Sequence, residues 1–495
     1  AQEPADALRF SWTVPSGTAR QQAIGGSMTS LGGDITATFI NPAGLGFYKT
    51  GDFAISPFYK FTNNKATYLN RTEKEKDQRF SLGTSGFVFG TGGFGRSIEN
   101  VSYSIAYNRS ADFNNILLYR GANNQSSYSQ KFVEELNNSG RRDSTVTYEF
   151  PFGSSLAFNT YWIDPEYNSA GKVTGFKTKL PAGSTLLQQH EIENRGGVNE
   201  FALGAAVNFK NKLMLGGSLA IPMLRYERDA TFSEADATEN TSNSFNYASV
   251  TENLVTKGIG FTIRAGLIFK PQEFWRIGLA IHSPTFYNLT DNYEASITTD
   301  TEDPSLGVLT DYSIDYTNGQ PSEFKYVLIT PYRVMGSVSY VLREIQDVTK
   351  QKGFITADVE YVNYKASSFK QDEEVDNDPS TEEYLQSLNR AIDNAYKGAF
   401  NVKLGGELKF TTIMVRAGAA YYGNPYKNIN GEKGNKLNLS GGLGYRNKGL
   451  FVDLTYVHAM NKDVHFPYRL QYSSYSGANI KSTAGSLLMT VGFKF

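Results

Sequence analysis

The last twelve residues of the chain, AGSLLMTVGFKF (484–495), alternate between two kinds of side chain. Large apolar residues stand at every second position, and mostly small or polar residues fill the places between them; the apolar set is Leu487, Met489, Val491, Phe493 and Phe495. A period of two residues is that of a β-strand, because successive side chains of a strand point to opposite faces of a sheet. The C-terminus is therefore predicted to be a strand with one apolar face.

The same alternation recurs along the chain and predicts about fourteen strands. The expected ranges are 51–61, 79–90, 99–109, 198–209, 213–226, 257–270, 275–287, 322–342, 353–364, 399–410, 413–423, 437–446, 449–460 and 484–495. Most of these ranges are about as long as a tilted strand that crosses a bilayer, which needs roughly nine to eleven residues in the hydrocarbon. In a soluble sandwich the apolar face of each strand would form the core, whereas in a membrane barrel it would contact lipid.

The connections between the expected strands favour the membrane barrel. Short turns at 210–212, 271–274, 411–412 and 446–449 alternate with longer segments. The longer segments are 62–78, 110–197, 227–256, 288–321, 365–398, 424–436 and 461–483. Bacterial outer-membrane barrels have short periplasmic turns and long extracellular loops in this order. The final strand, with Phe493 and Phe495, also resembles the signal that the barrel-insertion machinery of the outer membrane reads. We therefore expect an integral outer-membrane barrel with a periplasmic C-terminus.

The composition is compatible with a barrel and excludes several other classes. Of the 495 residues, 20% are charged and 14% aromatic, and no stretch approaches the eighteen or so apolar residues that a membrane-spanning helix needs. Tyr and Phe enrichment is typical of the aromatic girdles at the two membrane interfaces. The net charge of −1 provides no reason to expect a nucleic acid as partner. The chain begins Ala1-Gln2-Glu3, as expected of a mature protein after removal of a signal peptide.

No pattern in the sequence predicts catalysis, a metal or a cofactor. The four histidines, His190, His282, His458 and His465, lack the spacing of metal ligands, and cysteine is absent. No nucleophile elbow, phosphate-binding loop or zinc-protease motif occurs. We expect a protein that is not an enzyme.

Residues 1–50 do not have the pattern of a membrane strand. A short helix is predicted at 19–23, and glycine pairs at 25–26 and 32–33 follow it. Next come Asn41, Pro42, Ala43, Gly44 and Leu45, where proline restricts the backbone and glycine permits close approach. Without further context this motif is a tight turn before the first strand.

With this motif in this position, the chain resembles the FadL/TodX family of outer-membrane transporters for hydrophobic compounds. The resemblance rests on Asn41 to Leu45, on the glycine-rich segment before them and on fourteen strands that end in Phe495. It implies that residues 1–50 form a hatch, which blocks the lumen of a barrel formed by residues 51–495. It also implies that hydrophobic ligands enter from the extracellular loops and leave sideways through a kink in the third strand. Strand 99–109, however, contains no glycine or proline that would explain such a kink.

Charged residues fall on the lumen face of the expected strands, where an unpaired charge is costly. They are Arg264, Arg416, Asp358, Glu360, Lys403 and Glu407, and we expect them to bond to the hatch and to one another. Loop 110–197 is a candidate ligand-capturing canopy or docking surface. Loop 365–398 is predicted to contain a helix whose apolar face packs on the barrel mouth, on another loop or on a partner protein.

Two functions follow from these expectations. The first is passive, hatch-gated uptake of long-chain fatty acids or similar hydrophobic compounds. The second is a non-transporting barrel subunit of a larger outer-membrane assembly, such as a secretion or barrel-insertion machine. The expected surroundings are outer-membrane lipid and lipopolysaccharide, with other outer-membrane proteins in the second case.

Overall fold

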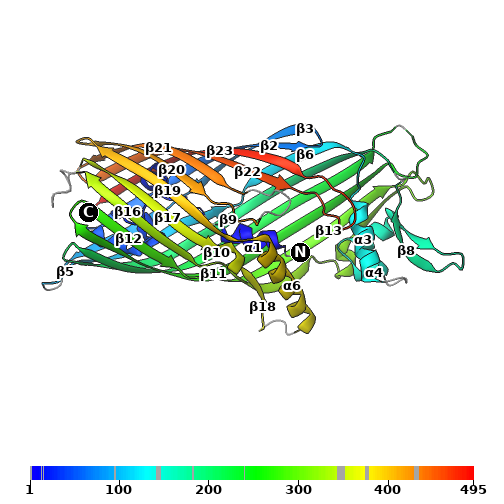
Figure 1. Cartoon of the computed structure of the whole chain (residues 1–495), viewed down its shortest axis with the longest axis horizontal. Coiled ribbons are helices and arrows are strands. Elements are labelled where there is room, and N and C mark those ends of the chain that lie inside the picture. The colour runs from blue at the N-terminus through cyan, green and yellow to red at the C-terminus, as the bar shows by residue number, and fades with distance from the viewer. Residues whose placement is uncertain are drawn as a thin grey trace.

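The alternating segments form the wall of a closed antiparallel barrel of fourteen strands (Figure 1). The computed structural model describes residues 3–12, 14, 16–93, 96–140, 146–180, 183–238, 240–342, 352–373, 378–427 and 434–495. The connection 343–352 between the expected strands 322–342 and 353–364 therefore lies almost wholly outside the described residues. None of the helices in these ranges is long and apolar enough to span a membrane.

Some wall strands are continuous and others are interrupted by a short bend. In chain order they are β1 with β2 (Asp52–Ile55, Pro57–Tyr68), β3 with β4 (Arg71–Leu82, Ser85–Gly92), β5 with β6 (Ile98–Asp112, Asn115–Asn123), β9 (Leu186–Phe209), β10 (Leu213–Asp236), β11 (Tyr247–Gln272), β12 with β13 (Trp275–His282, Phe286–Asp300), β15 with β16 (Ser322–Ile329, Arg333–Leu342), β17 with β18 (Gly353–Asn363, Ser368–Gln371), β19 (Gly398–Lys409), β20 (Ile413–Tyr422), β21 (Lys436–Asn447), β22 (Leu450–His465) and β23 (Ala478–Lys494).

The last strand closes the barrel against the first. Strand β23 pairs with β1 and β2 on one side and with β22 on the other. The backbone of Phe495 exchanges hydrogen bonds of 2.9 and 3.1 Å with that of Gly51. Phe493 and Phe495 are about half exposed on the outside of the wall. A closed barrel has no free strand edge, which is what a sheet within a membrane requires.

A continuous apolar belt surrounds the barrel. It is formed by the outward side chains of every wall strand and includes Ile105, Phe201, Leu203, Leu219, Ile259, Ile277, Val338, Ile355, Phe400, Leu404, Leu443, Leu454 and Leu487, all of them exposed. Exposed apolar surface on this scale is unfavourable in water and is stabilised in lipid.

On one side of the barrel the strands extend far beyond this belt. Strands β9, β10 and β11 are 24, 24 and 26 residues long, about twice the length needed to cross the hydrocarbon. The expected loops 62–78, 110–197, 227–256 and 288–321 were therefore wrong in part, because strands continue into them. Above the belt the outward residues are mostly polar and the apolar ones, such as Tyr226 and Phe232, face inward, so the apolar outer face that predicted the strands ends although the hydrogen-bond ladder continues.

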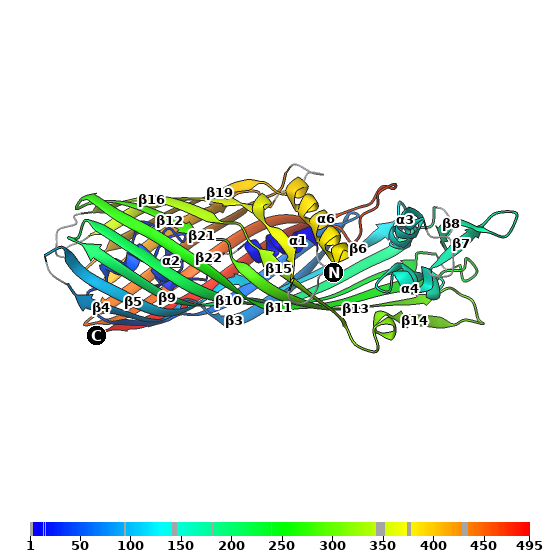
Figure 2. The ribbon, with the colours of Figure 1, turned by 90° about the horizontal axis from the view of Figure 1, so that it is seen from below.

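Helices and short strands gather at the end of the barrel opposite the C-terminus, where the strands are longest (Figure 2). Between β6 and β9 lie α3 (Ser129–Ser139), α4 (Val146–Glu149), α5 (Ser154–Asn159), β7 (Ile163–Tyr167) and β8 (Val173–Thr178). Strand β14 (Val308–Tyr312) and η3 (Ser313–Tyr316) follow β13, whereas η5 (Tyr364–Ala366) and α6 (Pro379–Ala395) flank β18. Helix α6 buries Leu385 and Ile392. These residues pack against α1 and the wall strands, so the apolar face of the helix lies on the barrel mouth.

Candidate functional site

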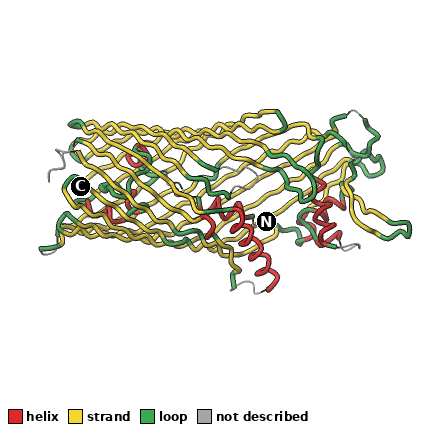
Figure 3. Tube along the Cα trace, viewed as in Figure 1, coloured by secondary structure: helices red, strands yellow, loops and turns green. Residues whose placement is uncertain are grey.

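The lumen is occupied by the N-terminal segment of the chain. This segment contains α1 (Pro4–Ser11), α2 (Ala19–Ala23), η1 (Ile35–Thr38) and η2 (Pro42–Phe47), and its helices and loops lie inside the ring of strands (Figure 3). Thr18 caps α2 by accepting a hydrogen bond from the backbone N–H of Gln21. We call residues 1–50 the hatch.

The Asn41–Leu45 motif is fitted to the inner wall. The Asn41 amide donates to the backbone carbonyls of Thr29 (2.6 Å), Leu267 (3.1 Å) and Leu279 (3.3 Å), and its Oδ1 accepts from the N–H of Ala43. It thus joins two parts of the hatch to β11 and β12. Asparagine is suited to this position because one side chain both donates and accepts.

Wall glycines make room for this motif. A Cβ atom on Gly216 would stand 2.4 Å from the Ala43 nitrogen, and one on Gly266 would stand 2.0 Å from Asn41 Oδ1. Gly44 is equally confined, since its Cβ would lie 2.8 Å from the Leu31 carbonyl oxygen. The backbone of the hatch therefore lies directly on the backbone of the wall, which only glycine permits.

The predicted lumen charges take two kinds of position. Asp358 bonds to the hatch directly, since its carboxylate accepts from Ser27 Oγ at 2.6 Å and from the Thr29 N–H at 3.0 Å. Arg416 instead pairs with Glu407 (2.6 Å) and Asp453 (2.5 Å) in the wall. Glu407 also lies 3.7 Å from Arg20 of the hatch. Arginine and carboxylates thus pair between nearby strands of the wall, next to the hatch, and not across the lumen as expected.

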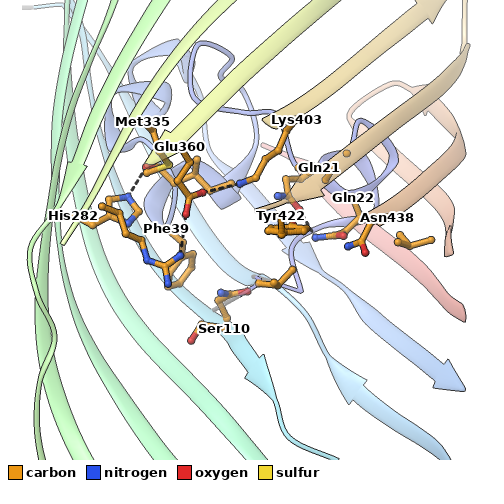
Figure 4. A pocket seen from close by; sticks show the side chains of 18 of the residues that line it. Gln21, Gln22, Phe39, Ser110, His282, Met335, Glu360, Lys403, Tyr422 and Asn438 are labelled. Atoms are coloured by element: carbon orange, nitrogen blue, oxygen red, sulfur yellow. Dashed lines mark hydrogen bonds and ion pairs between the residues drawn. The ribbon is translucent and has the colours of Figure 1, made fainter. Parts of the chain in front are cut away.

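Glu360 and Arg264 line a polar cavity beside the hatch (Figure 4). Glu360 pairs with Lys403 and with Arg333, each at 3.1 Å. Arg264 pairs with Glu200 at 2.8 Å, and its guanidinium lies over the ring of Phe39 in the hatch. The cavity is therefore lined by charges together with apolar side chains such as Phe39, Ile40 and Met335.

Arg264 retains unused hydrogen-bonding capacity. Its side chain is 8% exposed, and its Nε and Nη1 atoms have no hydrogen-bond partner among the described residues. A buried donor without a partner is costly, so an acceptor that enters the cavity would be stabilised there.

An apolar cluster fills the barrel above this cavity. Its members come from the wall, the hatch and the extracellular helix, and include Leu8 and Phe10 of α1, Leu385 and Ile392 of α6, and Tyr226, Leu254, Tyr287, Leu289, Tyr326 and Leu328 of the wall. Helix α1 thus occupies the part of the lumen in which apolar side chains converge.

The hydrogen-bond ladder of the wall is interrupted between the second and third strands. Strand β4 pairs with β5, but β3 pairs only with β2 among the described strands, and β6 lies against β2 and β3 without a ladder. At the interruption the hatch supplies the missing partners. The N–H of Thr84 donates to the carbonyl of Gly17, and the N–H of Ser16 donates to the carbonyl of Arg109, both at 2.9 Å.

The cause of the bend in the third strand lies in its neighbour. The strand has a bulge between Arg109 and Ala111 and breaks at residues 113–114. Opposite, on β9, Gly196 has a φ of +109°, and a Cβ on Gly197 would stand 2.4 Å from the carbonyl oxygen of Ala111. The glycines at this bend therefore lie on the neighbouring strand β9 and not on the third strand, where they were expected.

Two of the four histidines come together at Tyr119, in the part of the barrel beyond the apolar belt. The Tyr119 hydroxyl lies 2.8 Å from His190 Nδ1 and 2.9 Å from His465 Nδ1. Burial lowers the pKa of His465 to about 3, so this imidazole is neutral. No cluster of three or more metal-binding side chains occurs in the described ranges.

The chain thus has the architecture of a closed fourteen-stranded membrane barrel whose lumen is plugged by its own N-terminal segment. Known structures with this fold are a FadL homologue from Pseudomonas aeruginosa and the toluene transporter TodX from Pseudomonas putida. The first has 12% identity and a TM-score of 0.57, over 98% of this chain and 100% of that one. The second has 11% identity and a TM-score of 0.52, over 97% and 98%. At these identities the comparison establishes the FadL-type fold. No family model and no curated protein matches the sequence.

Proposed function

We propose that this protein is a passive outer-membrane channel that admits hydrophobic or amphipathic molecules from outside and releases them sideways when the hatch moves. The observation that carries the proposal is the interruption of the wall between β3 and β6, where Ser16 and Gly17 of the hatch provide the backbone partners. Movement of these two residues would leave backbone groups of the wall without partners and would open a route through the wall itself.

The apolar cluster supports an entry route above the hatch. Each methylene of a ligand that replaced α1 there would gain about 0.8 kcal/mol by burial. The gate would use part of this free energy, because a ligand shifts an equilibrium only by its differential affinity for the two states.

We further propose long-chain fatty acids, or other amphiphiles with an acidic head, as the transported class. The support is the polar cavity below the apolar cluster, in which two nitrogen atoms of Arg264, Nε and Nη1, have no hydrogen-bond partner among the described residues. A carboxylate accepts such donors well. The P. putida neighbour is described as a toluene transporter, so the shared fold alone does not favour an acidic ligand.

A disulfide between hatch and wall tests the gating proposal. The Ser16 hydroxyl lies 3.4 Å from Asn108 Oδ1, and the chain contains no cysteine, so the variant Ser16→Cys/Asn108→Cys has a single possible bridge. We expect fatty-acid flux into proteoliposomes to fall when this variant is oxidised and to recover on reduction. Each single-cysteine variant is the control. Equal flux in the oxidised and reduced forms would contradict a gate at this position.

The second candidate, a non-transporting subunit of a larger assembly, is favoured by one observation. The cavity beside the hatch contains the charged side chains of Arg264, Arg333, Glu360 and Lys403, which a route for a purely hydrophobic ligand would not need. Extraction from the native membrane in mild detergent, followed by mass spectrometry, separates the two. Bound fatty acid without a stoichiometric partner supports transport, whereas stoichiometric partner proteins without such a ligand support the assembly.

A further inference from the structure

Four lysines stand side by side on the outer surface of four adjacent strands. Lys65 on β2 is the direct cross-strand partner of Lys74 on β3 and of Lys481 on β23. Lys481 is in turn the direct partner of Lys462 on β22. All four side chains are exposed, and we call them the lysine row.

This arrangement is unfavourable in the protein alone. Direct cross-strand partners lie about 5 Å apart at Cβ, and like charges in such positions destabilise a sheet. The nearest residues on the same face carry no acidic group; they are Asn63, Thr67, Thr72, Lys76, Met460, Val464, Asn479 and Thr483. Among the described residues no member of the row forms an ion pair. Within the described residues, the positive charge of the row is therefore not neutralised by neighbouring side chains.

Elsewhere on the extended strands opposite charges are interspersed. Arg195 on β9 pairs with Asp229 on β10, and Arg225 pairs with Glu227. On β3 itself, Glu73 pairs with Arg71 and Arg120. The lysine row departs from this pattern on one side of the barrel only.

A surface hollow lies directly below the row, toward the apolar belt. Its lining includes the aromatic rings of Tyr59, Phe61 and Tyr456, together with Lys76 and His458. Gly485, which is the register partner of both Phe61 and His458, contributes no side chain to this surface. Below the hollow the belt continues with Leu487 and Leu454. From the row downward the surface thus changes from cationic to aromatic to apolar.

This order matches the structure of a lipid with an anionic head. We propose that the lysine row and the hollow below it bind a phosphorylated glycolipid of the outer leaflet. The phosphate accepts hydrogen bonds from the lysines, the sugar lies against the aromatic rings, and the acyl chains follow the belt. Lysine suits this role because its three donors can turn toward a phosphate at a water-exposed surface. The proposal concerns the outer surface and is independent of the transport route.

The variant Lys65→Gln/Lys481→Gln tests it by removing the two central charges. The matched control is Lys257→Gln/Lys370→Gln, which removes two exposed strand lysines outside the row. We expect wild type and control to retain the glycolipid during purification in mild detergent, and the row variant to retain about tenfold less. Equal retention by all three would overturn the proposal.

Thermal unfolding in glycolipid-free detergent provides an independent readout. Without glycolipid, the row variant should unfold at the same temperature as wild type or higher, because like charges have been removed. Added phosphorylated glycolipid should then raise the unfolding temperature of wild type but not of the row variant.

Two further lipids added to the wild-type protein test which chemical group is bound, even if the variant does not fold. Dephosphorylated glycolipid should not stabilise it, and equal stabilisation would refute the role of phosphate. Phosphatidylglycerol in mixed micelles should stabilise it less; an equal effect would mean that the row binds any anionic lipid and would overturn the assignment to a glycolipid.

Discussion

Replacement of Asp358 by alanine is expected to release the hatch while the barrel remains folded. The carboxylate of Asp358 accepts from Ser27 Oγ (2.6 Å) and the Thr29 N–H (3.0 Å) of the hatch, and from Ser337 Oγ (2.5 Å) of the wall. A hydrogen bond to a charged group contributes roughly 1.5–3 kcal/mol. Loss of the two hatch bonds should therefore weaken docking by about 3 kcal/mol or more, which raises the ratio of undocked to docked hatch about a hundredfold.

Amide hydrogen exchange measures this shift directly. Residues 19–50 should exchange about a hundredfold faster in Asp358→Ala than in wild type, whereas the amides of β9 to β11 should be unchanged. The matched control is Asp291→Ala, because Asp291 is also a buried lumen carboxylate and accepts from Thr256 and Tyr326 of the wall. Flux of small polar solutes through proteoliposomes should rise in Asp358→Ala only.

Two results would refute this reasoning. Unchanged exchange in residues 19–50 would mean that Asp358 does not hold the hatch. Equal acceleration in Asp291→Ala would mean that any buried carboxylate loosens the whole lumen, so that the contacts to Ser27 and Thr29 have no special role.

Three further predictions follow from single contacts. Gly216→Ala should loosen the hatch by about 1–3 kcal/mol, measured by the same exchange, because its Cβ meets Ala43; the adjacent Gly217→Ala, which has no atom nearer than 3.6 Å, should not. Arg264→Gln should weaken the binding of a fatty acid about tenfold or more in calorimetry but leave that of the matching alkane unchanged, and an equal loss for both would remove Arg264 from head-group binding. Burial raises the pKa of Glu234, which accepts from Ser127 and the Tyr128 N–H before α3, from 4.5 to about 7. The folded state thus holds a proton that the unfolded chain has released, so the packing of α3 should be strongest below about pH 4.5 and weaken as the pH rises through about 7. Exchange protection of α3 at pH 5 and pH 8 tests this, and a Glu234→Gln variant that keeps the same dependence would contradict it.

The sequence alone was sufficient for the membrane-spanning part of the fold. Within the belt, lipid selects apolar residues at every second position, so a local period of two marks each strand from 484–495 back to 51–61. Above the belt the outward side chains are mostly polar, and buried apolar residues such as Phe232 and Leu254 alternate with buried polar ones such as Glu234 along the inner face, so the apolar outer face no longer marks the strand. For this reason the extensions of β9, β10 and β11 were expected as loops.

The Asn41–Leu45 motif was also visible in the sequence, but the wall residues that it contacts were not. Asn41 and Pro42 mark an unusual turn, whereas their contacts with Gly216 and Gly266 join residues about 170 positions or more apart in the chain. The bend in the third strand is a similar case, because Gly196 and Gly197 of the neighbouring strand cause it.

Local alternation therefore determined that the chain forms a barrel and which side chains face lipid. Only the tertiary structure decided which residues meet, such as His190 with His465, the hatch with Thr84, and the four lysines of the row. The physical reason is that side-chain alternation depends on successive residues of one strand, whereas cross-strand register depends on backbone hydrogen bonds between different segments, which lie far apart in the sequence where β23 closes on β2.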